Sequence, residues 1–522
     1  MCQTIRSFWR SDRATLEFNR QSVSQPNTVS AITWKTVTTI AASSLLSCSS
    51  LLWFSFSAQA AVGPYCQFAS EEVAAKEKQL KASLANKQST PAYVDTVRRH
   101  REMLELCRSQ TWPQEQAIWL RLHPCDIKPG AVDEVLDRIV NLGYSKIHLE
   151  VFYDSQVLLP PSDNPTPWTS VVRSPEAERV DLLQQTIDKA HQRGLKVYAW
   201  LFTMNFGYTY AQRPDRQDAL ARNGKGEDSL TFVDDRAQAF VDPYSPQAQQ
   251  DYSNLVQAVL KRQPDGILFD YVRYPRGIGG QSYVHSVKDL WIYGKSSINA
   301  LYRRASNQKG LALIEKFIER GSLSPGDVET VDSQYPKEER AKWQGRPGDL
   351  DSKTDSKEDI SSRQKKLNRE LWFFSVAHAA QGIVDFLAAA AKPAQDRDLA
   401  AGAVFFPDAN RLVGTTGFDS RLQAWDKFPR DLEWHPMAYA VCGDRTDCIT
   451  DQVISVLQTA PDTTVVPALA GAWGKVYREH PPLETQMESL RKATPEINSI
   501  SHFSYAWQEP ERDRRRKSCN FL

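Results

Sequence analysis

The chain has 522 residues, of which 41% are hydrophobic and 24% are charged, a composition that is ordinary for a soluble globular protein. Its formal net charge of +1 excludes the strongly basic balance of a typical nucleic-acid-binding protein, so we expect no nucleic-acid partner. The length suggests two or three domains, although a single (β/α)8 barrel with insertions also accommodates it.

Residues 1–61 are predicted to be an export signal. A mostly apolar segment runs from Val37 to Ala61 after Lys35, and it ends in Ala58-Gln59-Ala60-Ala61, small residues at the spacing that a signal peptidase requires. The apolar core is short for a membrane span, and Leu45-Leu46-Ser47-Cys48 weakly resembles a lipoprotein box. We therefore expect a secreted, periplasmic or cell-envelope protein that meets the membrane only through this signal or a lipid anchor.

Removal of this segment would leave six cysteines in an oxidising compartment, namely Cys66, Cys107, Cys125, Cys442, Cys448 and Cys519. The first two bracket a predicted pair of helices, and Cys442 and Cys448 bracket a short polar loop. Both pairs could close as disulfides. Zinc is the weaker interpretation, because no C-x-x-C motif or histidine cluster accompanies these cysteines.

Residues 62–112 are predicted to form a helical hairpin. Two helical patterns within residues 67–109 are separated by Gln88-Ser89-Thr90-Pro91, a cluster that stops one helix and starts the next. Such a hairpin has little core of its own, so we expect it to pack on the domain that follows.

Residues 113–510 are predicted to form a (β/α)8 barrel. Apolar strand patterns at 117–122, 146–152, 196–202 and 266–271 alternate with helical patterns at 132–142, 180–192 and 246–261. Four more strands are predicted at 403–406, 434–439, 464–469 and 500–505. Eight strands, with no glycine-rich phosphate loop after the first, favour a closed barrel over a doubly wound sheet.

A long insertion, about residues 278–370, separates the fourth and fifth strands. Its part from Gly348 to Lys366 is so charged and poor in apolar residues that we expect disorder or a mobile loop. The basic segment 511–522 is interpreted as a solvated tail.

Asp270 is the strongest candidate for a catalytic residue. It ends the apolar run Gly266-Ile267-Leu268-Phe269-Asp270, and catalytic residues of such barrels lie where strands end. A buried aspartate needs a partner. Asp270 is therefore either a nucleophile or general acid/base that faces a cleft, or half of a structural pair with Arg273.

Glycoside hydrolysis would need a second carboxyl, about 5 Å away for retention or roughly 6.5–9.5 Å away for inversion. Asp408 follows the fifth strand, Glu150 lies within the second strand, and Glu509 follows the last strand. The sequence leaves the choice among these three acids open.

Aromatic and polar residues near the strand ends are candidate sugar contacts, because a flat apolar ring with a polar tip suits a carbohydrate face. The alternative for each of them is core packing. The candidates are Trp200, Asn205, Arg273, Tyr274, His435, Tyr439, Trp473 and Trp507.

Three blocks of the sequence resemble the glycosyl-hydrolase-like family 10. Residues 191–200, His-Gln-Arg-Gly-Leu-Lys-Val-Tyr-Ala-Trp, resemble its H-x-R-G-L-x-V-x-A-W signature. Residues 241–246 and 265–275 resemble its most specific block, and the stretch from Pro160 to Trp168 is similar in outline to a third. The match covers 117–275 well and is looser from 400 to 510. The strand-two segment around Glu150 and the strand-six segment around His435 both depart from the family's pattern.

This resemblance implies a TIM barrel in the cell envelope or outside the cell, which hydrolyses O-glycosidic bonds of a polysaccharide. It points to Asp270 as the acidic residue of the site and to peptidoglycan glycan strands as one substrate class. Tyr439 matches the family's pattern at the sixth strand, whereas His435 does not. The rival hypothesis is a polysaccharide-binding barrel without catalysis. No acidic cluster has the spacing of a calcium loop, so we expect no metal and no cofactor.

Overall fold

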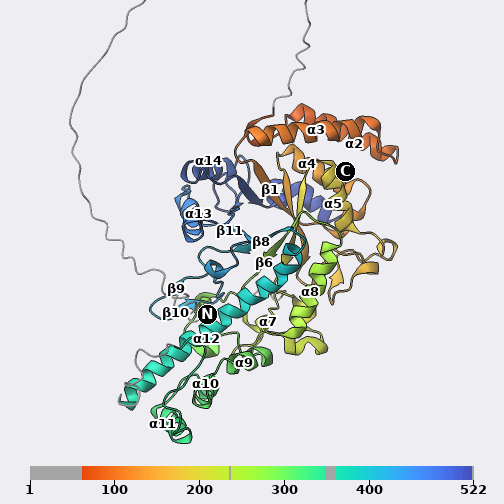
Figure 1. The fold of residues 1–522 in the computed structure, drawn as a ribbon. Coiled ribbons are helices and arrows are strands. Elements are labelled where there is room, and N and C mark those ends of the chain that lie inside the picture. Colours follow the sequence, from red (N-terminus) through yellow and green to blue (C-terminus); the bar gives the residue numbers. More distant parts are fainter. Residues whose placement is uncertain (1–61, 234–236, 347–358, 520–522) are drawn as a thin grey trace, which may run out of the picture.

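The computed structural model describes residues 62–233, 237–346 and 359–519. Eight parallel strands follow one another in the order β1-β13-β12-β11-β8-β6-β5-β2, and pairing of β1 with β2 closes the ring (Figure 1). This closure confirms the predicted (β/α)8 barrel. The strands are β1 (Glu115–Leu120), β2 (Lys146–Tyr153), β5 (Lys196–Phe202), β6 (Gly266–Asp270), β8 (Ala400–Phe405), β11 (Glu433–Ala438), β12 (Ala468–Ala470) and β13 (Ser499–Phe503).

Helices cover the outside of the barrel, and polar caps begin several of them. Asp181 accepts a hydrogen bond from the Gln184 amide at the start of α5, and Ser245 caps α8, whose first residue is Pro246. The outer helices are α4 (Ala131–Asn141), α5 (Leu182–Gln192), α8 (Pro246–Leu260), α12 (Ile360–Gln395), α13 (Asp447–Thr459), α14 (Leu483–Ala493) and α15 (Tyr505–Gln508).

Shorter elements lie in the loops at the carboxyl ends of the strands. They include β3 (Gln156–Val157) and β4 (Thr169–Ser170), which extend the main sheet beyond β2, and the short helices α6 (Tyr208–Ala211) and α7 (Ser229–Phe232).

Large side chains fill the middle of the barrel. The Trp119 ring lies 4.6 Å from the His148 ring, which lies 5.5 Å from the His435 ring. Gly402 makes room for this layer, because a Cβ there would approach His435 Nε2 to 2.7 Å. The layer is a packed core that closes the barrel below its carboxyl end.

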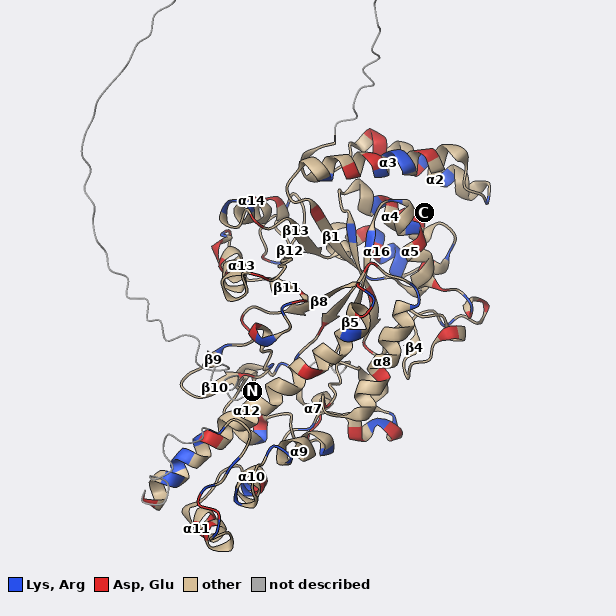
Figure 2. Ribbon diagram, viewed as in Figure 1, with Lys and Arg blue, Asp and Glu red and all other residues tan. Residues whose placement is uncertain are grey.

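The hairpin of α2 (Ser70–Ala85) and α3 (Pro91–Gln110) lies across the opposite end of the barrel (Figure 1). Charges of both signs cover its surface (Figure 2), and a buried polar network joins it to the barrel. Asp137 of α4 accepts hydrogen bonds from Tyr93 of α3 and from Arg193 after α5, each at 2.8 Å. Lys76 of α2 lies 4.0 Å from the same carboxylate.

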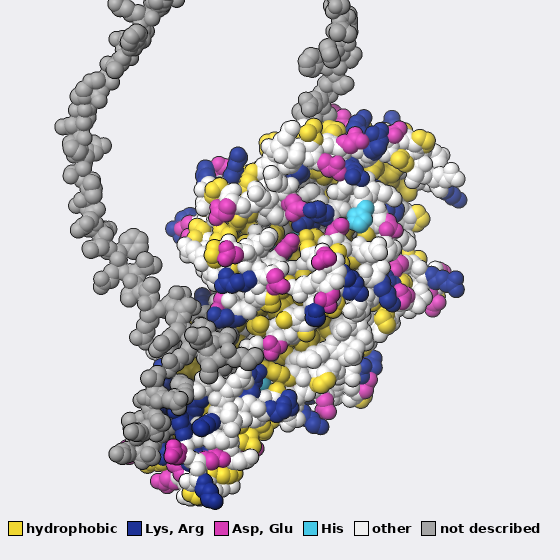
Figure 3. Space-filling view, in the orientation of Figure 1, with side chains coloured by type: hydrophobic (Ala, Val, Ile, Leu, Met, Phe, Trp, Pro, Cys, Tyr) yellow, Lys and Arg dark blue, Asp and Glu magenta, His cyan; other side chains and the backbone are white. Residues whose placement is uncertain are grey.

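The insertion after β6 contains α9 (Lys295–Tyr302), α10 (Gln308–Arg320) and α11 (Pro325–Gln334), which lie beside the amino-terminal half of α12, beyond the barrel (Figure 1). A small antiparallel sheet, β7 (Tyr283–Val284), β10 (Gly417–Asp419) and β9 (Leu412–Val413), joins it to the loop after β8. Acidic and basic side chains are interspersed over the face in Figure 3, as the near-zero net charge implies.

The expectation of disorder from Gly348 to Lys366 is wrong for residues 360–366, while 347–358 lie outside the described residues. Residues 360–366 form the first turns of α12, because Asp359 caps the helix and Arg363 pairs with Asp332 at 2.8 Å. Among the described residues, α12 is long and apolar enough to suit a membrane span, but 61% of its apolar window is buried within this fold.

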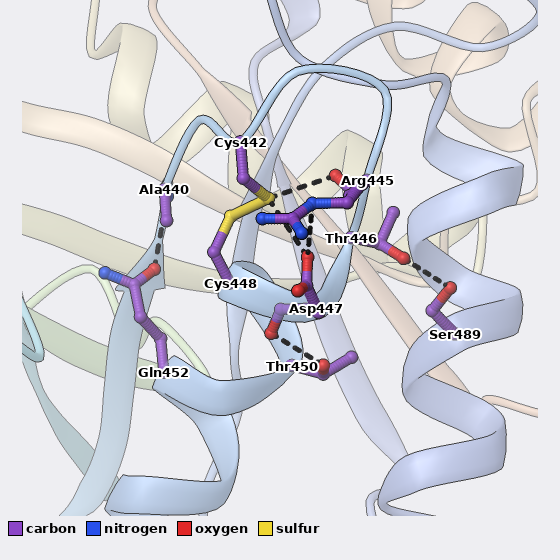
Figure 4. Close-up of a disulfide and its surroundings, with 9 residues drawn as sticks. All are labelled: Ala440, Cys442, Arg445, Thr446, Asp447, Cys448, Thr450, Gln452 and Ser489. Atoms are coloured by element: carbon purple, nitrogen blue, oxygen red, sulfur yellow. Dashed lines mark hydrogen bonds and ion pairs between the residues drawn. A yellow bond between two sulfur atoms is a disulfide. The ribbon is translucent and has the colours of Figure 1, made fainter.

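Three disulfides form among the residues that the structure describes. The two predicted pairs, Cys66–Cys107 and Cys442–Cys448, both form, and the second closes the loop before α13 (Figure 4). The third, Cys125–Cys519, joins the loop after β1 to the carboxyl-terminal region.

The interpretation of the basic segment as a solvated tail is wrong for Arg512 and Arg516. Residues Pro510–Lys517 form α16, and Arg516 is buried with two hydrogen bonds, of 2.6 and 3.0 Å, to Asp126. Arg512 pairs with Glu134 at 2.7 Å. The charges of this segment therefore attach the end of the chain to the barrel.

Candidate functional site

A cavity of about 220 Å³ opens at the carboxyl ends of the barrel strands. Aromatic and apolar side chains form most of its wall, and two acids and two arginines supply its charges. The lining residues are Trp119, Arg121, Glu150, Trp200, Phe202, Asp270, Tyr271, Arg273, Phe406, Met437, Tyr439 and Phe503.

Asp270, the last residue of β6, points into this cavity and is only 7% exposed. Its Oδ2 accepts a hydrogen bond from Trp200 Nε1 at 3.1 Å, and its Oδ1 accepts one from the Tyr271 amide at 2.6 Å. Burial raises the pKa of Asp270 to about 6, although these donors and the nearby Arg273 charge oppose the rise. Asp270 can therefore exchange a proton near neutral pH.

Glu150 of β2 is the second carboxyl of the cavity. Arg121, just beyond β1, binds it through two nitrogens, with Nη2 2.9 Å from Oε1 and Nε in contact with Oε2. Burial raises the pKa of Glu150 to about 7 although Arg121 opposes the rise, and the charges of Asp154 and Asp270 raise it further. The structure thus brings Glu150 and Asp270 from different strands into one electrostatic environment.

The backbone beside both carboxyls departs from regular strand geometry. The pairing of β2 with β5 shifts register between Glu150 and Phe152, and Tyr271 adopts a left-handed conformation with φ +55° directly after Asp270. Such irregularities re-aim side chains and are held in place at functional sites.

Arg273 is the second cation of the cavity and is 8% exposed. Its Nη1 donates to the carbonyl oxygen of Tyr274 at 3.0 Å, and its guanidinium lies 4.6 Å from the centroid of the Tyr271 ring. The structure shows no ion pair between Arg273 and Asp270, although the Arg273 charge acts on the Asp270 pKa. The alternative of a direct structural pair between these two residues is therefore wrong.

The structure does not bring Asp408 or Glu509 to the cavity. Asp408 lies on the surface near the rim, where Arg421 and Arg411 are its ion-pair partners at 3.4 and 3.7 Å. Glu509 pairs with Arg138 at 2.7 Å. Of the three acids that the sequence left open, Glu150 alone lines the cavity with Asp270.

Three expected sugar contacts are buried away from the cavity. His435 lies in the barrel's middle layer, where its Nε2 is 3.1 Å from Glu433 Oε2. The Asn205 carbonyl oxygen accepts from the amides of Gly207 and Ala239, which shapes the loop after β5. Tyr274 is fully buried. Substrate contact by these three is corrected to a structural role, because none of them lines the cavity.

The other four aromatic candidates divide. Trp200 and Tyr439 line the cavity. Trp507 is half-buried and does not line the cavity, but its ring lies 5.5 Å from that of Phe503 in the cavity wall. Trp473 instead packs between the rings of Tyr65 and His502 and donates to Tyr144 Oη at 3.1 Å, so we assign it to packing.

Sequence reasoning missed Arg121 and the aromatic wall formed by Trp119, Phe202, Phe406 and Phe503. A usable indication was present for Arg121, because it directly follows a strand and comes two residues after the inward-facing Trp119, a spacing that puts both side chains on the same face. Among the described residues, no group of three or more His, Cys, Asp or Glu side chains is arranged to hold a metal ion.

Part of the chain matches a known protein family in sequence. Residues 117–305 match the family described as glycosyl hydrolase-like 10. Glycosyl hydrolase DigH of Escherichia coli K12 is 26% identical over 211 residues, which cover 38% of this chain and 46% of that protein. DigH of Shigella flexneri matches to the same extent. The similarity thus spans less than half the length of these relatives.

Solved structures with a similar fold include a GH18 chitinase from Pseudoalteromonas aurantia, at a TM-score of 0.35 and 9% identity over 78% of this chain and 99% of the chitinase. A β-galactosidase from Marinomonas ef1 has a TM-score of 0.42 and 11% identity, over 78% of this chain and 59% of that enzyme. The assignment of the barrel itself rests on the strand order of this chain.

Proposed function

We propose that the protein hydrolyses O-glycosidic bonds of a polysaccharide, because residues 117–305 match the glycosyl hydrolase-like 10 family. The observation that carries the proposal is the pair of buried carboxyls, Asp270 and Glu150, in one aromatic cavity at the carboxyl end of the barrel. The three disulfides support a secreted or periplasmic location, since such bonds persist in oxidising compartments.

The chemistry needs one carboxyl in each protonation state. A protonated carboxyl donates to the leaving glycosidic oxygen, while an ionised one stabilises the oxocarbenium-like transition state, either by attacking the sugar or by activating water. The pKa values of Asp270 and Glu150, raised by burial to about 6 and about 7, allow both states to coexist near neutral pH. Trp200 helps to fix the Asp270 carboxyl through its indole N–H.

The substrate that we propose is a cell-envelope or extracellular polysaccharide, with peptidoglycan glycan strands as one member of the class. Trp200 and Tyr439 line the wall, and aromatic rings of this kind have flat faces on which sugar rings stack. This proposal for the substrate rests on the family match and on the aromatic side chains that line the cavity.

Polysaccharide binding without cleavage is the second candidate. One observation favours it: Arg121 occupies both oxygens of Glu150, which restrains that carboxyl from exchanging a proton.

A panel of purified envelope and extracellular polysaccharides, with mass spectrometry of released products, tests the proposal. We expect Asp270→Asn and Glu150→Gln each to lower sugar release at least about 100-fold, the scale of a lost general acid or base. Asp408→Asn, a rim acid outside the cavity, should retain activity. Thermal unfolding must show that each variant is folded.

Unchanged release by folded Asp270→Asn protein would reject catalysis by this residue. Binding to a polysaccharide with no products in any digest would favour the non-catalytic candidate.

A further inference from the structure

The charges that line the cavity are unevenly paired. Arg121 is bound to Glu150 through two nitrogens. Arg273, in contrast, forms no ion pair with any described residue, and its one protein hydrogen bond is from Nη1 to the carbonyl oxygen of Tyr274. The cavity thus contains a guanidinium, 8% exposed, without a carboxylate of its own.

A buried cation that forms no ion pair is costly, since burial takes it out of water without a carboxylate in direct contact. Neighbouring arginines add to the cost: the positive charges of Arg421 and Arg276 lower the pKa of Arg273 further, after burial itself. Within the protein, interactions with Tyr271 and with the negative charge of Asp270 oppose this lowering of the Arg273 pKa, and the faces of the Tyr271 and Phe240 rings lie 4.6 and 5.5 Å from the guanidinium.

We propose that the cavity binds a sugar unit that carries a carboxylate, and that Arg273 binds this group and selects acidic over neutral polysaccharides. The inference rests on the proposed function, whose substrate class it narrows. A planar guanidinium with free N–H groups suits two-point binding of a carboxylate. The Nε and Nη2 atoms of Arg273 donate to no acceptor among the described residues, so they remain available for it.

Further aromatic rings and positive charges lie next to the cavity wall, in the loop after β12 and around Trp507. Phe503, in the cavity wall, contacts Trp507, whose ring lies 5.0 Å from that of Tyr477 in the loop after β12. Arg478 of this loop lies 5.1 Å from the centroid of the Trp507 ring. Arg478 and the nearby Lys475 are exposed and form no ion pair among the described residues.

This track of aromatic faces with flanking positive charges is suited to the next units of an acidic chain. The loop's cations are Lys475 and Arg478, and the acids beside them are Glu479 and Glu484, whose carboxylate accepts from the Gly474 amide at 3.0 Å. The loop thus offers cations near an aromatic face, while Arg273 carries the proposal.

Matched polysaccharides provide the test. Polygalacturonate, alginate and hyaluronan are each compared with the same polymer after chemical reduction of its carboxyl groups, so that backbone and linkage stay constant. Binding is measured by affinity electrophoresis at about 0.15 M salt, where nonspecific long-range attraction is screened. Sugar release from the same pairs is measured in parallel.

We expect at least one acidic polymer to bind about tenfold or more tightly than its reduced form. Arg273→Gln should abolish most of this preference and leave binding of the reduced polymer unchanged. Arg273→Lys, which keeps the charge without the planar fork, should retain part of it. Arg276→Gln, which removes an exposed charge three residues away, is the matched control and should keep the full preference.

The inference would be overturned if the protein bound none of the acidic polymers, or if it bound the acidic and the reduced form of every polymer equally. So would an equal effect of Arg273→Gln and Arg276→Gln, because that result would indicate general charge attraction. If Arg273→Gln does not fold, Arg273→Lys decides alone: a reduced preference supports the inference and an unchanged one contradicts it.

A third result would contradict selection by Arg273 and indicate instead that this residue acts on the pKa of Asp270. In that case Arg273→Gln would shift the pH dependence of cleavage equally for both members of a pair, without altering the preference. Selective binding without cleavage of any polymer would instead reject hydrolysis and leave acidic-sugar recognition standing.

Discussion

At the scale of single residues, the burial that suits Asp270 to proton transfer also destabilises the folded protein once the pH exceeds the pKa of this carboxyl in the unfolded chain. Its pKa is raised from 3.8 to about 6, mainly by burial. Below the pKa of Asp270 in the unfolded chain, the carboxyl is protonated in both the folded and the unfolded state, so its burial does not lower the free energy of unfolding. As the pH rises through the folded value, the unfolded state has already released its proton, so stability has fallen by about 3 kcal/mol at most.

Asp270→Asn is therefore expected to raise the free energy of unfolding at pH 8 by up to about 3 kcal/mol, and to leave it nearly unchanged at pH 3. Urea unfolding at the two pH values measures this difference. The exposed Asp462→Asn is the control and should show no such pH-dependent gain. An equal effect of Asp270→Asn at both pH values would mean that the carboxyl is not destabilised by burial.

The same two carboxyls set the expected pH dependence of activity. Cleavage needs one proton on the pair formed by Asp270 and Glu150, whose pKa values are raised to about 6 and about 7. Activity should therefore follow a bell-shaped curve with its maximum between about pH 6 and pH 7. Initial rates of sugar release across pH 4–9 would show it; a flat profile over roughly pH 5–8 would contradict the carboxyl pair.

The sequence identified Asp270 because an apolar strand that ends in an acid is a local pattern. It could not choose among Asp408, Glu150 and Glu509, since that choice depends on which strand ends converge and which arginine each acid meets. Arg421 holds Asp408 outside the cavity, whereas Arg121 holds Glu150 within it. These are contacts across many residues of sequence, which no local pattern encodes.

At the scale of elements, all eight barrel strands were predicted from alternating apolar runs and helical periods. The seventh shows the limit of that method. Residues 464–469 were predicted, but β12 is Ala468–Ala470 and begins directly after Pro467, which has no N–H to donate. The preceding residues still follow the neighbouring strand, since Val465 forms an isolated bridge with Trp434.

The hairpin of α2 and α3 shows how a weakly apolar element is attached. Asp137 hydrogen-bonds Arg193 and Tyr93 and is the ion-pair partner of the buried Lys76. Asp137→Ala should lower the free energy of unfolding by about 3–5 kcal/mol, because it leaves buried cations short of a counter-ion. Sugar release by the folded variant should persist at 25 °C, since the hairpin lies across one end of the barrel (Figure 1), whereas the cavity is lined by residues at the carboxyl ends of the strands, at the other end.

Glu102→Ala is the matched control for this variant. It removes an acid from the same hairpin, but Glu102 pairs with Arg98 in solvent at 3.0 Å, so the expected loss is below about 1 kcal/mol. Equal losses in the two variants would contradict the role of Asp137 in docking the hairpin.

At the scale of the whole molecule, distant parts of the chain meet beside β1. Cys125 and Cys519 are 394 residues apart in sequence, and Arg516 binds Asp126 next to this disulfide. Cys442–Cys448, in contrast, spans a sequence separation of 6. A cross-link restricts the unfolded chain more when it closes a longer loop.

Loss of Cys125–Cys519 should therefore destabilise the protein more than loss of Cys442–Cys448, by about 4 kcal/mol in the chain-entropy relation. Urea unfolding of the double variants Cys125→Ala/Cys519→Ala and Cys442→Ala/Cys448→Ala compares the two bonds without free thiols. The short loop keeps other contacts, since Thr446 hydrogen-bonds Ser489 of α14 at 2.7 Å (Figure 4). Equal destabilisation by the two double variants would show that closure of the long loop does not stabilise the barrel.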